Sequence, residues 1–460
     1  MKRIITLILA AAVLLSLASC GTGNETTPTA APTAAPTSEP TAETKEEFYV
    51  VDCSDFLSVG SGNTLIAETE NSIYFIQDAW KQRHYMIWFS DKETHDWMPL
   101  CGRPNCRHND ADCNAWFEGD PRGSIWLYGD HIYYIEDNSI DMTYSTEYDM
   151  YPELWRMKLD GTDHERLLKI DLSEPMDEIR KTGSTYEYSF GWSFHNRYAV
   201  VHFWGNSGDG RNEEDDIVDF DNYNDTRRFW NYVIDLSENK PKQREIAVHD
   251  RDGNAIPLTA FLAGHGDTLF CGHDRSIYSV NLASGESRFL CELPFETYVT
   301  TKGSYEDGKI WFCDGWDEGI IISVDAETGE ITEVNSAEPQ ERMWYHVVNG
   351  RIFGTDYPYE MELSPEVLEM FRENGIEVPQ KKYPDRFCTD IFDLYGSLIV
   401  NIPHEAYGDI RIGIGHILGD IVFGYEGSES GGLDVRKLPE YYLDLRELGT
   451  DSFGWKKWNP

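Results

Sequence analysis

The chain has 460 residues, with 81 Asp and Glu residues against 39 Lys and Arg residues, which gives a formal net charge of −42. A field of this sign repels the phosphates of nucleic acids and anionic lipid headgroups, so the composition excludes a nucleic-acid partner. With 40% hydrophobic and 13% aromatic residues, the chain is able to bury a large core.

The N-terminus has the three parts of an export signal. A positively charged start at Lys2 and Arg3 is followed by an apolar segment from Ile4 to Leu17 and by small residues that precede Cys20. The apolar segment is too short and wrongly flanked for a membrane-spanning helix. We therefore expect the chain to be exported.

The segment Leu17-Ala18-Ser19-Cys20 resembles a bacterial lipobox. The resemblance implies that residues 1–19 are a lipoprotein signal peptide and that the mature chain begins at Cys20, which carries a lipid. The protein would then be anchored in the lipid bilayer, on the extracytoplasmic face of the cell membrane. The alternative is an ordinary secretory signal that ends at a chance cysteine.

Residues 20–47 form a low-complexity tether. The stretch from Gly21 to Glu47 has no aromatic residue, and its prolines recur every four residues from Pro28 to Pro40. This composition cannot bury a core, so we expect the segment to be disordered and biased toward extended polyproline II. No second linker of this kind follows, which favours one large folded domain over residues 48–460.

The folded part alternates short apolar strands with tight turns. A turn containing Gly, Asn or Asp precedes most of these runs, which is the signal of a β-hairpin. The runs are Ser72–Ile76, His131–Ile135, Arg197–Val201, Thr268–Cys271, Lys309–Cys313, Arg351–Phe353 and Ser397–Val400. A second strand and another Gly turn usually follow, as at Leu154–Leu159, Ser276–Leu282 and Ile320–Asp325.

Repeats of this length, built of short antiparallel strands, predict an all-β fold, a β-propeller. Seven blades fit the spacing best, and six or eight remain open. The strand Phe48 to Val51 is expected to complete the last blade by pairing with a C-terminal strand. The segment Ser364 to Asn374 has the pattern of a short helix and is expected to be an insertion on one blade.

The turns Leu159-Asp160-Gly161-Thr162 and Asp325-Ala326-Glu327-Thr328-Gly329-Glu330 resemble those of TolB-like and WD40/YWTD-like propellers. Together with the lipobox and the tether, the chain resembles lipid-anchored propeller proteins of anaerobic Gram-positive bacteria. The resemblance implies fold and location, and it assigns no activity.

One compact chemical signal stands out. Cys101, Cys106, His108 and Cys113 fall within thirteen residues. Three thiolates and an imidazole are able to bind zinc tetrahedrally, although the interval between Cys106 and His108 is shorter than in common zinc fingers. Because export permits oxidation, a disulfide between Cys101 and Cys106 or between Cys106 and Cys113 is the favoured interpretation, with zinc second and free thiols third. Cys271 and Cys313 each follow two apolar residues in a predicted strand, which indicates that these two cysteines are small core residues rather than reactive or metal-binding ones.

Two further groups are weaker candidates. Tryptophans near loops or blade ends could form a ligand-binding face, although packing between blades explains most aromatic residues of a propeller. These candidates are Trp192, Trp204, Trp230, Trp316 and Trp344. The acidic stretch 213–225 could bind calcium through carboxylate oxygens, but it lacks the spacing of an EF-hand loop, and a solvated acidic insertion fits it better.

The sequence favours a cell-surface lipoprotein whose propeller binds a glycan, a peptide or a protein. It contains no G-x-S-x-G, P-loop or H-E-x-x-H motif, which disfavours the corresponding enzyme classes. An extracytoplasmic carbohydrate-active hydrolase or lyase is the first alternative, because such an enzyme needs only two well-placed carboxylates. A structural component of an envelope complex is the second.

Replacing Cys20 with Ala should release the domain from membranes without unfolding it, because the tether shares no core with the propeller. Fractionation of cells that express the variant measures this. A folded Cys20→Ala protein that is processed at its N-terminus and yet stays in the membrane fraction would contradict the lipoprotein assignment.

Overall fold

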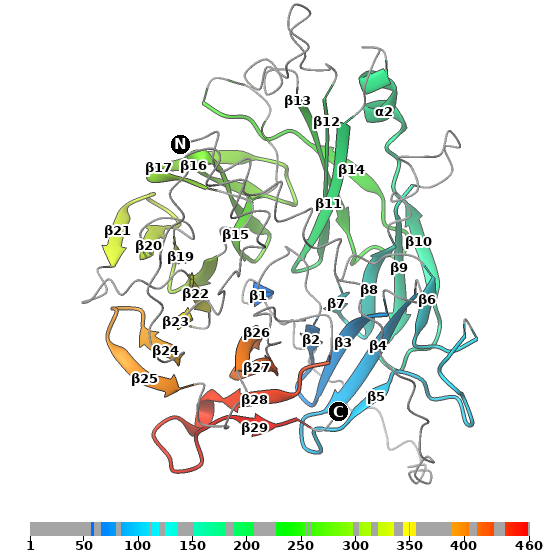
Figure 1. The fold of residues 1–460 in the computed structure, drawn as a ribbon. Helices are drawn as coiled ribbons and strands as arrows, with labels where there is room; N and C mark the ends of the chain where they lie inside the picture. The colour runs from blue at the N-terminus through cyan, green and yellow to red at the C-terminus, as the bar shows by residue number, and fades with distance from the viewer. Residues whose placement is uncertain are drawn as a thin grey trace, which may run out of the picture. The chain divides into compact units, whose positions relative to one another are not determined.

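The computed structural model describes residues 57–58 and, with gaps, residues 66–458; the longest gaps are 137–150, 207–226, 356–387 and 427–437. All these residues belong to the unit Phe48–Pro460. Their strands form seven antiparallel sheets, which are arranged around a common centre as the blades of a propeller (Figure 1). The predicted all-β propeller with seven blades is confirmed.

The first three blades follow one another along the chain. Blade 1 contains β2 (Ile66–Glu68), β3 (Ser72–Ala79), β4 (His84–Asp91), β5 (Trp97–Pro99) and β6 (Trp116–Glu118). Blade 2 contains β7 (Ile125–Tyr128), β8 (His131–Glu136), β9 (Glu153–Lys158) and β10 (Glu165–Lys169). Blade 3 contains β11 (Glu187–His195), β12 (Tyr198–Asn206), β13 (Arg227–Asp235) and β14 (Gln243–Ile246).

The remaining blades complete the ring. Blade 4 contains β15 (Ala260–His265), β16 (Thr268–Asn281) and β17 (Ser287–Thr297). Blade 5 contains β18 (Gly303–Glu306), β19 (Lys309–Cys313), β20 (Ile321–Asp325) and β21 (Ile331–Val334). Blade 6 contains β22 (Trp344–Val348), β23 (Arg351–Thr355), β24 (Cys388–Asp393) and β25 (Leu398–Pro403). Blade 7 contains β1 (Leu57–Ser58), β26 (Ile412–Leu418), β27 (Ile421–Glu426), β28 (Tyr441–Asp444) and β29 (Lys456–Lys457).

The apolar runs are continuous rather than alternating because both faces of a blade are covered. Ile73, Tyr74, Phe75 and Ile76 of β3 are at most 3% exposed, although successive side chains of a strand point to opposite faces. Each face packs against a neighbouring blade. This explains why the runs are visible in the sequence.

Six of the seven predicted runs are the second strand of a blade: they fall in β3, β8, β12, β16, β19 and β23. The seventh run, Ser397–Val400, does not mark a further blade. It lies in β25, the outer strand of blade 6. The corresponding strand of blade 7 is β27, which follows the turn at Gly419 and Asp420. A tight turn followed by an apolar strand occurs in any hairpin, so the signal does not specify which hairpin of a blade it marks.

Blade 4 has the same plan as its neighbours. The N–H of Leu282 donates a 2.8 Å hydrogen bond to the carbonyl of Asp267, so the two ends of β16 lie side by side. Equivalent bonds join the second and third strands of blade 3, from Leu236 to Arg197, and of blade 5, from Ala326 to Gly308. The single element β16 therefore supplies both the second and the third strand of blade 4. This agrees with the sequence, which predicted two separate runs there, Thr268–Cys271 and Ser276–Leu282.

The ring is closed at its inner and outer edges by the two ends of the described chain. On the inner side, β1 pairs antiparallel with β26, with Leu57 opposite Ile417 (Figure 1). On the outer side, Trp458 is 1% exposed and its Nε1–H donates a 3.1 Å hydrogen bond to Ser90 Oγ of blade 1. An N-terminal strand thus pairs with the last blade as expected, while the segment Phe48 to Val51 lies outside the described residues.

The helical prediction is only partly testable. The segment Ser364 to Asn374 lies outside the described residues. The described helix is α2 (Ser173–Arg180), between blades 2 and 3, which sequence reasoning missed. Its signals are modest: Asp171 accepts hydrogen bonds from the N–H and hydroxyl of Ser173, and Glu174 stands in the first turn. Within the described part of the chain, helices are too short or too polar to cross a membrane.

Replacing Trp458 with Ala should destabilise the whole domain by about 3–5 kcal/mol, because it leaves a cavity where blade 7 packs against blade 1. Denaturant melts of the folded domain measure the effect. Tyr395→Ala is the matched control, since that aromatic side chain is 86% exposed and its loss should change stability by about 0.5 kcal/mol or less. Equal melts for the two variants would show that Trp458 does not close the ring.

Candidate functional site

The four residues of the Cys/His motif lie on a loop that interrupts the outer strand of blade 1. Before the loop, the N–H of Leu100 donates to the carbonyl of Ile87 at 2.9 Å; after it, the carbonyl of Ala115 accepts from the N–H of Ile87 at 3.0 Å. The strands β5 and β6 therefore continue one line along β4, and residues 101–114 leave that line and return to it.

The loop is folded back by tight turns. The N–H of Cys106 bonds to the carbonyl of Arg103 at 3.3 Å, and that of Cys113 bonds to the carbonyl of Asp110 at 3.0 Å. Asn105 and His108 have positive φ angles of 62° and 53°. Asn and His are both enriched among the non-glycine residues that adopt this left-handed conformation. The turns bring the middle of the loop back over its start.

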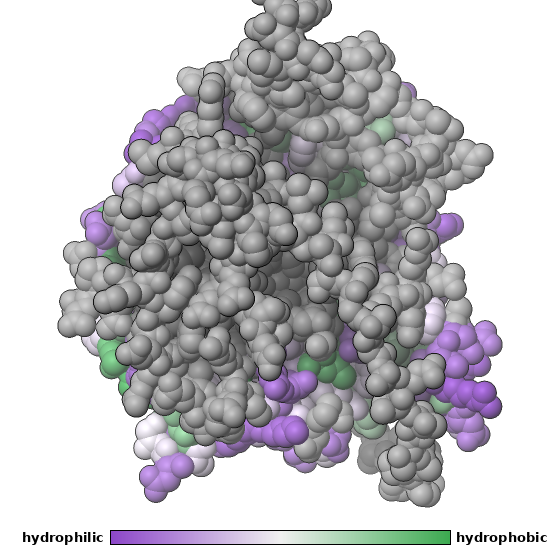
Figure 2. Space-filling model, in the orientation of Figure 1, coloured by the Kyte–Doolittle hydropathy of each residue, from purple (hydrophilic) through white to green (hydrophobic). Residues whose placement is uncertain are grey.

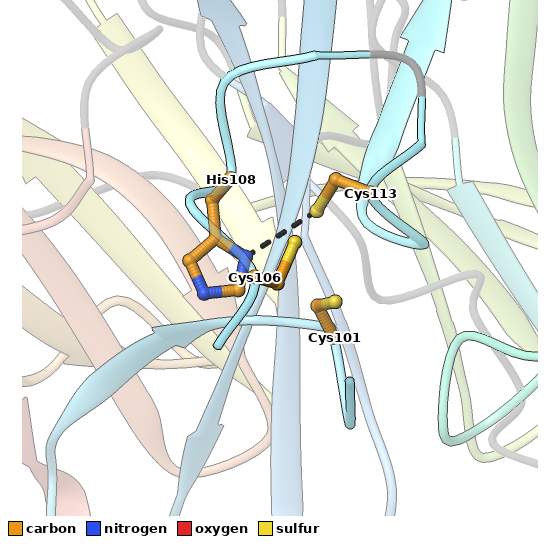
Figure 3. Close-up of side chains that lie close together, drawn as sticks. All are labelled: Cys101, Cys106, His108 and Cys113. Atoms are coloured by element: carbon orange, nitrogen blue, oxygen red, sulfur yellow. Dashed lines mark hydrogen bonds between the residues drawn. The ribbon is translucent and has the colours of Figure 1, made fainter. Parts of the chain in front are cut away.

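As a result, the four side chains converge (Figure 3). One ligand atom from each of Cys101, Cys106, His108 and Cys113 lies within 4.8 Å of all the others, and His108 Nδ1 is 3.3 Å from Cys113 Sγ. In a tetrahedral zinc site with bonds of about 2.0–2.3 Å, neighbouring ligand atoms are about 3.4–3.8 Å apart. The cluster has the donor set and nearly the spacing of a closed, four-ligand site.

The backbone supports a negative charge on one sulfur. Burial tends to raise the pKa of Cys101, but the N–H groups of Arg103 and Asn114 and the thiols of Cys106 and Cys113 bond to it and lower that pKa overall. Burial raises the pKa of Cys113 to about 12, against a smaller opposing effect from the N–H of Ala115. The surroundings therefore favour the thiolate of Cys101 over that of Cys113, and a bound cation would stabilise negative charge on the sulfurs.

Blade 2 packs against this loop. Gly161 has φ 76°, and a Cβ there would lie 2.5 Å from the carbonyl oxygen of Leu100, so the close approach requires glycine. His164 Nε2 lies 3.0 Å from the carbonyl oxygen of Asn114. A mainly apolar hollow of about 600 Å³ lies beside the cluster, and its lining includes Cys101, His108 and Leu159. The cluster thus sits where blade 2 meets the outer edge of blade 1.

The described cysteines are all free of disulfide bonds: they are Cys101, Cys106, Cys113, Cys271 and Cys291. Cys271 is fully buried in blade 4, as predicted, while the side chain of Cys313 lies outside the described part.

The tryptophan candidates divide into two groups. Trp192 and Trp230 are 4% and 9% exposed and belong to the core between blades 2 and 3, while Trp204 is half-buried on β12. Trp316, the side chain of Trp344 and the acidic stretch 213–225 lie outside the described residues. Any role for these groups in ligand or calcium binding stays a prediction.

Sequence reasoning missed a second hollow, also of about 600 Å³, between blades 7 and 1. His95 lines it together with residues of both blades, among them Glu68, Tyr442 and Trp458. A signal for His95 existed. The turn Asp91-Lys92-Glu93-Thr94-His95 matches Asp325-Ala326-Glu327-Thr328-Gly329 of blade 5, with histidine in place of glycine.

No family model matches the chain, and no curated protein matches it. Among solved structures, it is similar to an acylaminoacyl peptidase of Pyrococcus horikoshii, at 12% identity over 86% of this chain and 52% of that one, with a TM-score of 0.45. A structure from a study of two prolyl endopeptidases gives 11% identity, 89% and 52% coverage, and a TM-score of 0.45. The computationally designed protein Ika8 gives 10% identity, 80% and 81% coverage, and a TM-score of 0.38.

The chain spans about half the length of the acylaminoacyl peptidase and of the protein from the prolyl endopeptidase study. With identities of 10–12% and TM-scores of 0.38–0.45, these likenesses say nothing about the activity of this chain.

Proposed function

We propose that this chain is an exported lipoprotein, anchored through Cys20, whose propeller is a binding module for a glycan, a peptide or a protein. The observation that supports a binding module is a pair of hollows, each of about 600 Å³, at the two seams that blade 1 forms with its neighbours. A closed ring holds its seams rigidly, and rigid concave surfaces lose little entropy when they bind a ligand.

We further propose that Cys101, Cys106, His108 and Cys113 hold a structural Zn²⁺. The convergence of their ligand atoms within 4.8 Å supports this, because a disulfide would use only two of the sulfurs and would leave His108 without a role. Zinc in a closed four-ligand site contributes folding energy rather than catalysis. Its role here is to fix the inserted loop against blade 2.

The zinc proposal predicts about one equivalent of Zn²⁺ per chain in protein purified without chelator, and a lower melting temperature once the metal is removed. His108→Ala and Cys113→Ala should lose the metal, as measured by elemental analysis. Cys271→Ala is the control, because it also deletes a buried thiol but lies in blade 4, so it should keep the metal.

A metal-free wild-type protein with two fewer titratable thiols than cysteines would instead support a disulfide. Retention of stoichiometric zinc by both His108→Ala and Cys113→Ala would show that the metal binds elsewhere.

The binding proposal predicts that the soluble domain from Phe48 onward retains at least one class of glycan, peptide or protein on an array, with binding that survives physiological salt. Heat-denatured domain is the control for adsorption by an acidic polypeptide. Release of reducing ends or altered products during incubation would favour the hydrolase or lyase alternative instead.

A further inference from the structure

The hollow between blades 7 and 1 is built by residues from both ends of the ring. Its lining comes from short turns of blade 1, near Glu68 and Lys92, and from the last strands of blade 7, near Tyr442 and Lys456. These elements lie side by side in Figure 1, and hydrophilic residues gather along the same edge in Figure 2, over β28 and β29.

His95 takes up a backbone conformation that other blades give to glycine. In blade 5, Gly329 donates its N–H to the carbonyl of Asp325 and has φ 74°; in blade 4, Gly285 donates to Asn281 and has φ 79°. His95 makes the same bond to Asp91 with φ 58°. A side chain at this angle costs about 1–2 kcal/mol, so glycine would be the more stable choice for the turn alone.

The strain places an imidazole at the aromatic side of the hollow. The ring of His95 stacks on Tyr442, with centroids 4.9 Å apart, and lies edge-on to Trp458 at 4.4 Å. His95 stays half-exposed, while Trp458 is buried beneath it. Burial and the charge of Lys456 lower the pKa of His95, so the ring is neutral at pH 7 and offers both a donor and an acceptor.

Charged groups of both signs surround this aromatic surface, and most of them are paired. Lys92 bonds to Glu68 at 2.5 Å, Lys456 bonds to Glu447 at 2.5 Å, and Arg446 bonds to Asp444 at 2.7 Å. Glu70 and Asp420 add two exposed carboxylates. Asp420 in turn lies 3.3 Å from Arg351. The lining therefore has five carboxylates against three cations, which repels an anionic ligand, while the pairing of most of these carboxylates leaves little free charge to bind a strongly cationic one.

Hydrogen-bond donors and acceptors beside the half-buried rings of His95 and Tyr442 fit a ligand that has many hydroxyl groups and an apolar face. We propose that this hollow binds a neutral carbohydrate, with His95 as its central contact. The inference rests on the proposed function, since it names the ligand class and the position of the binding module.

The decisive variant is His95→Gly, because it removes the imidazole and also relieves the turn. We expect its melting temperature to equal or exceed that of the wild type, while affinity for the neutral oligosaccharide falls about tenfold or more. The probes are neutral oligosaccharides of glucose, galactose, mannose and N-acetylglucosamine, measured by calorimetry on the full folded domain. Asp307→Gly is the matched control: it relieves a positive φ of 51° in an exposed turn of blade 5 and should leave binding unchanged.

A second variant keeps the test decisive if His95→Gly is unstable. Glu70→Trp adds bulk at an exposed position of the lining and should block the hollow without disturbing the core. Glu70→Gln should bind the oligosaccharide nearly as well as the wild type, whereas a tenfold loss would indicate a cationic ligand and overturn the inference.

Other outcomes separate this inference from the proposed function. Wild-type binding of peptides or proteins, with no oligosaccharide bound, overturns the carbohydrate inference and leaves the binding module standing. Oligosaccharide binding that survives both His95→Gly and Glu70→Trp places the ligand elsewhere on the ring. Absence of any ligand on any array would contradict the proposed function itself.

Discussion

The seam between the last and the first blade is the constraint on which the rest of this fold depends. Each blade has two apolar faces and needs two neighbours, but most of blade 7 comes from the opposite end of the chain to blade 1, so this seam joins residues far apart in the sequence. The protein closes the seam twice: β1 extends the sheet of blade 7 on the inner side, and Trp458 packs against Trp97 of blade 1 on the outer side. The Nε1–H of Trp97 also bonds to the carbonyl of Pro439 at 3.4 Å.

The Cys/His loop also needs contacts beyond its own blade to hold one conformation. Residues 101–114 leave the outer strand of blade 1, and the part from Gly102 to Asp112 has little apolar surface to bury apart from Cys106. Chain without a core needs a cross-link to hold one conformation, and the proposed zinc, coordinated by four side chains, would provide it in a few residues. The close contact of Gly161 with Leu100 shows that blade 2 is fitted to the loop in that conformation.

Sequence reasoning was most successful where burial on both faces produced a long local signal. The runs at Ile73, Ile132 and Ile310 identify second strands because each contains at least three consecutive apolar residues that are buried on both faces of the blade. It failed where a pattern has two meanings, as at Ser397–Val400, and where the partner is remote. Nothing near Trp458 in the sequence indicates Ser90. The Cys/His cluster could be recognised from spacing, but the convergence of its four ligand atoms within 4.8 Å depends on the turns at Asn105 and His108, which spacing alone does not show.

The way the ring is sealed also has a kinetic consequence. The bonds that Trp97 and Trp458 make across the seam join residues separated by 342 and 368 positions in the sequence, whereas the strand pairs within blades 1 to 6 are local. Most blades can therefore form early and one by one. The last seam forms slowly, because it needs contacts between residues that are far apart in the sequence. During that interval the unsealed faces of blades 1 and 7 are exposed to other chains. The net charge of −42 then acts as a kinetic safeguard, because mutual repulsion keeps partly folded molecules apart until the ring is sealed.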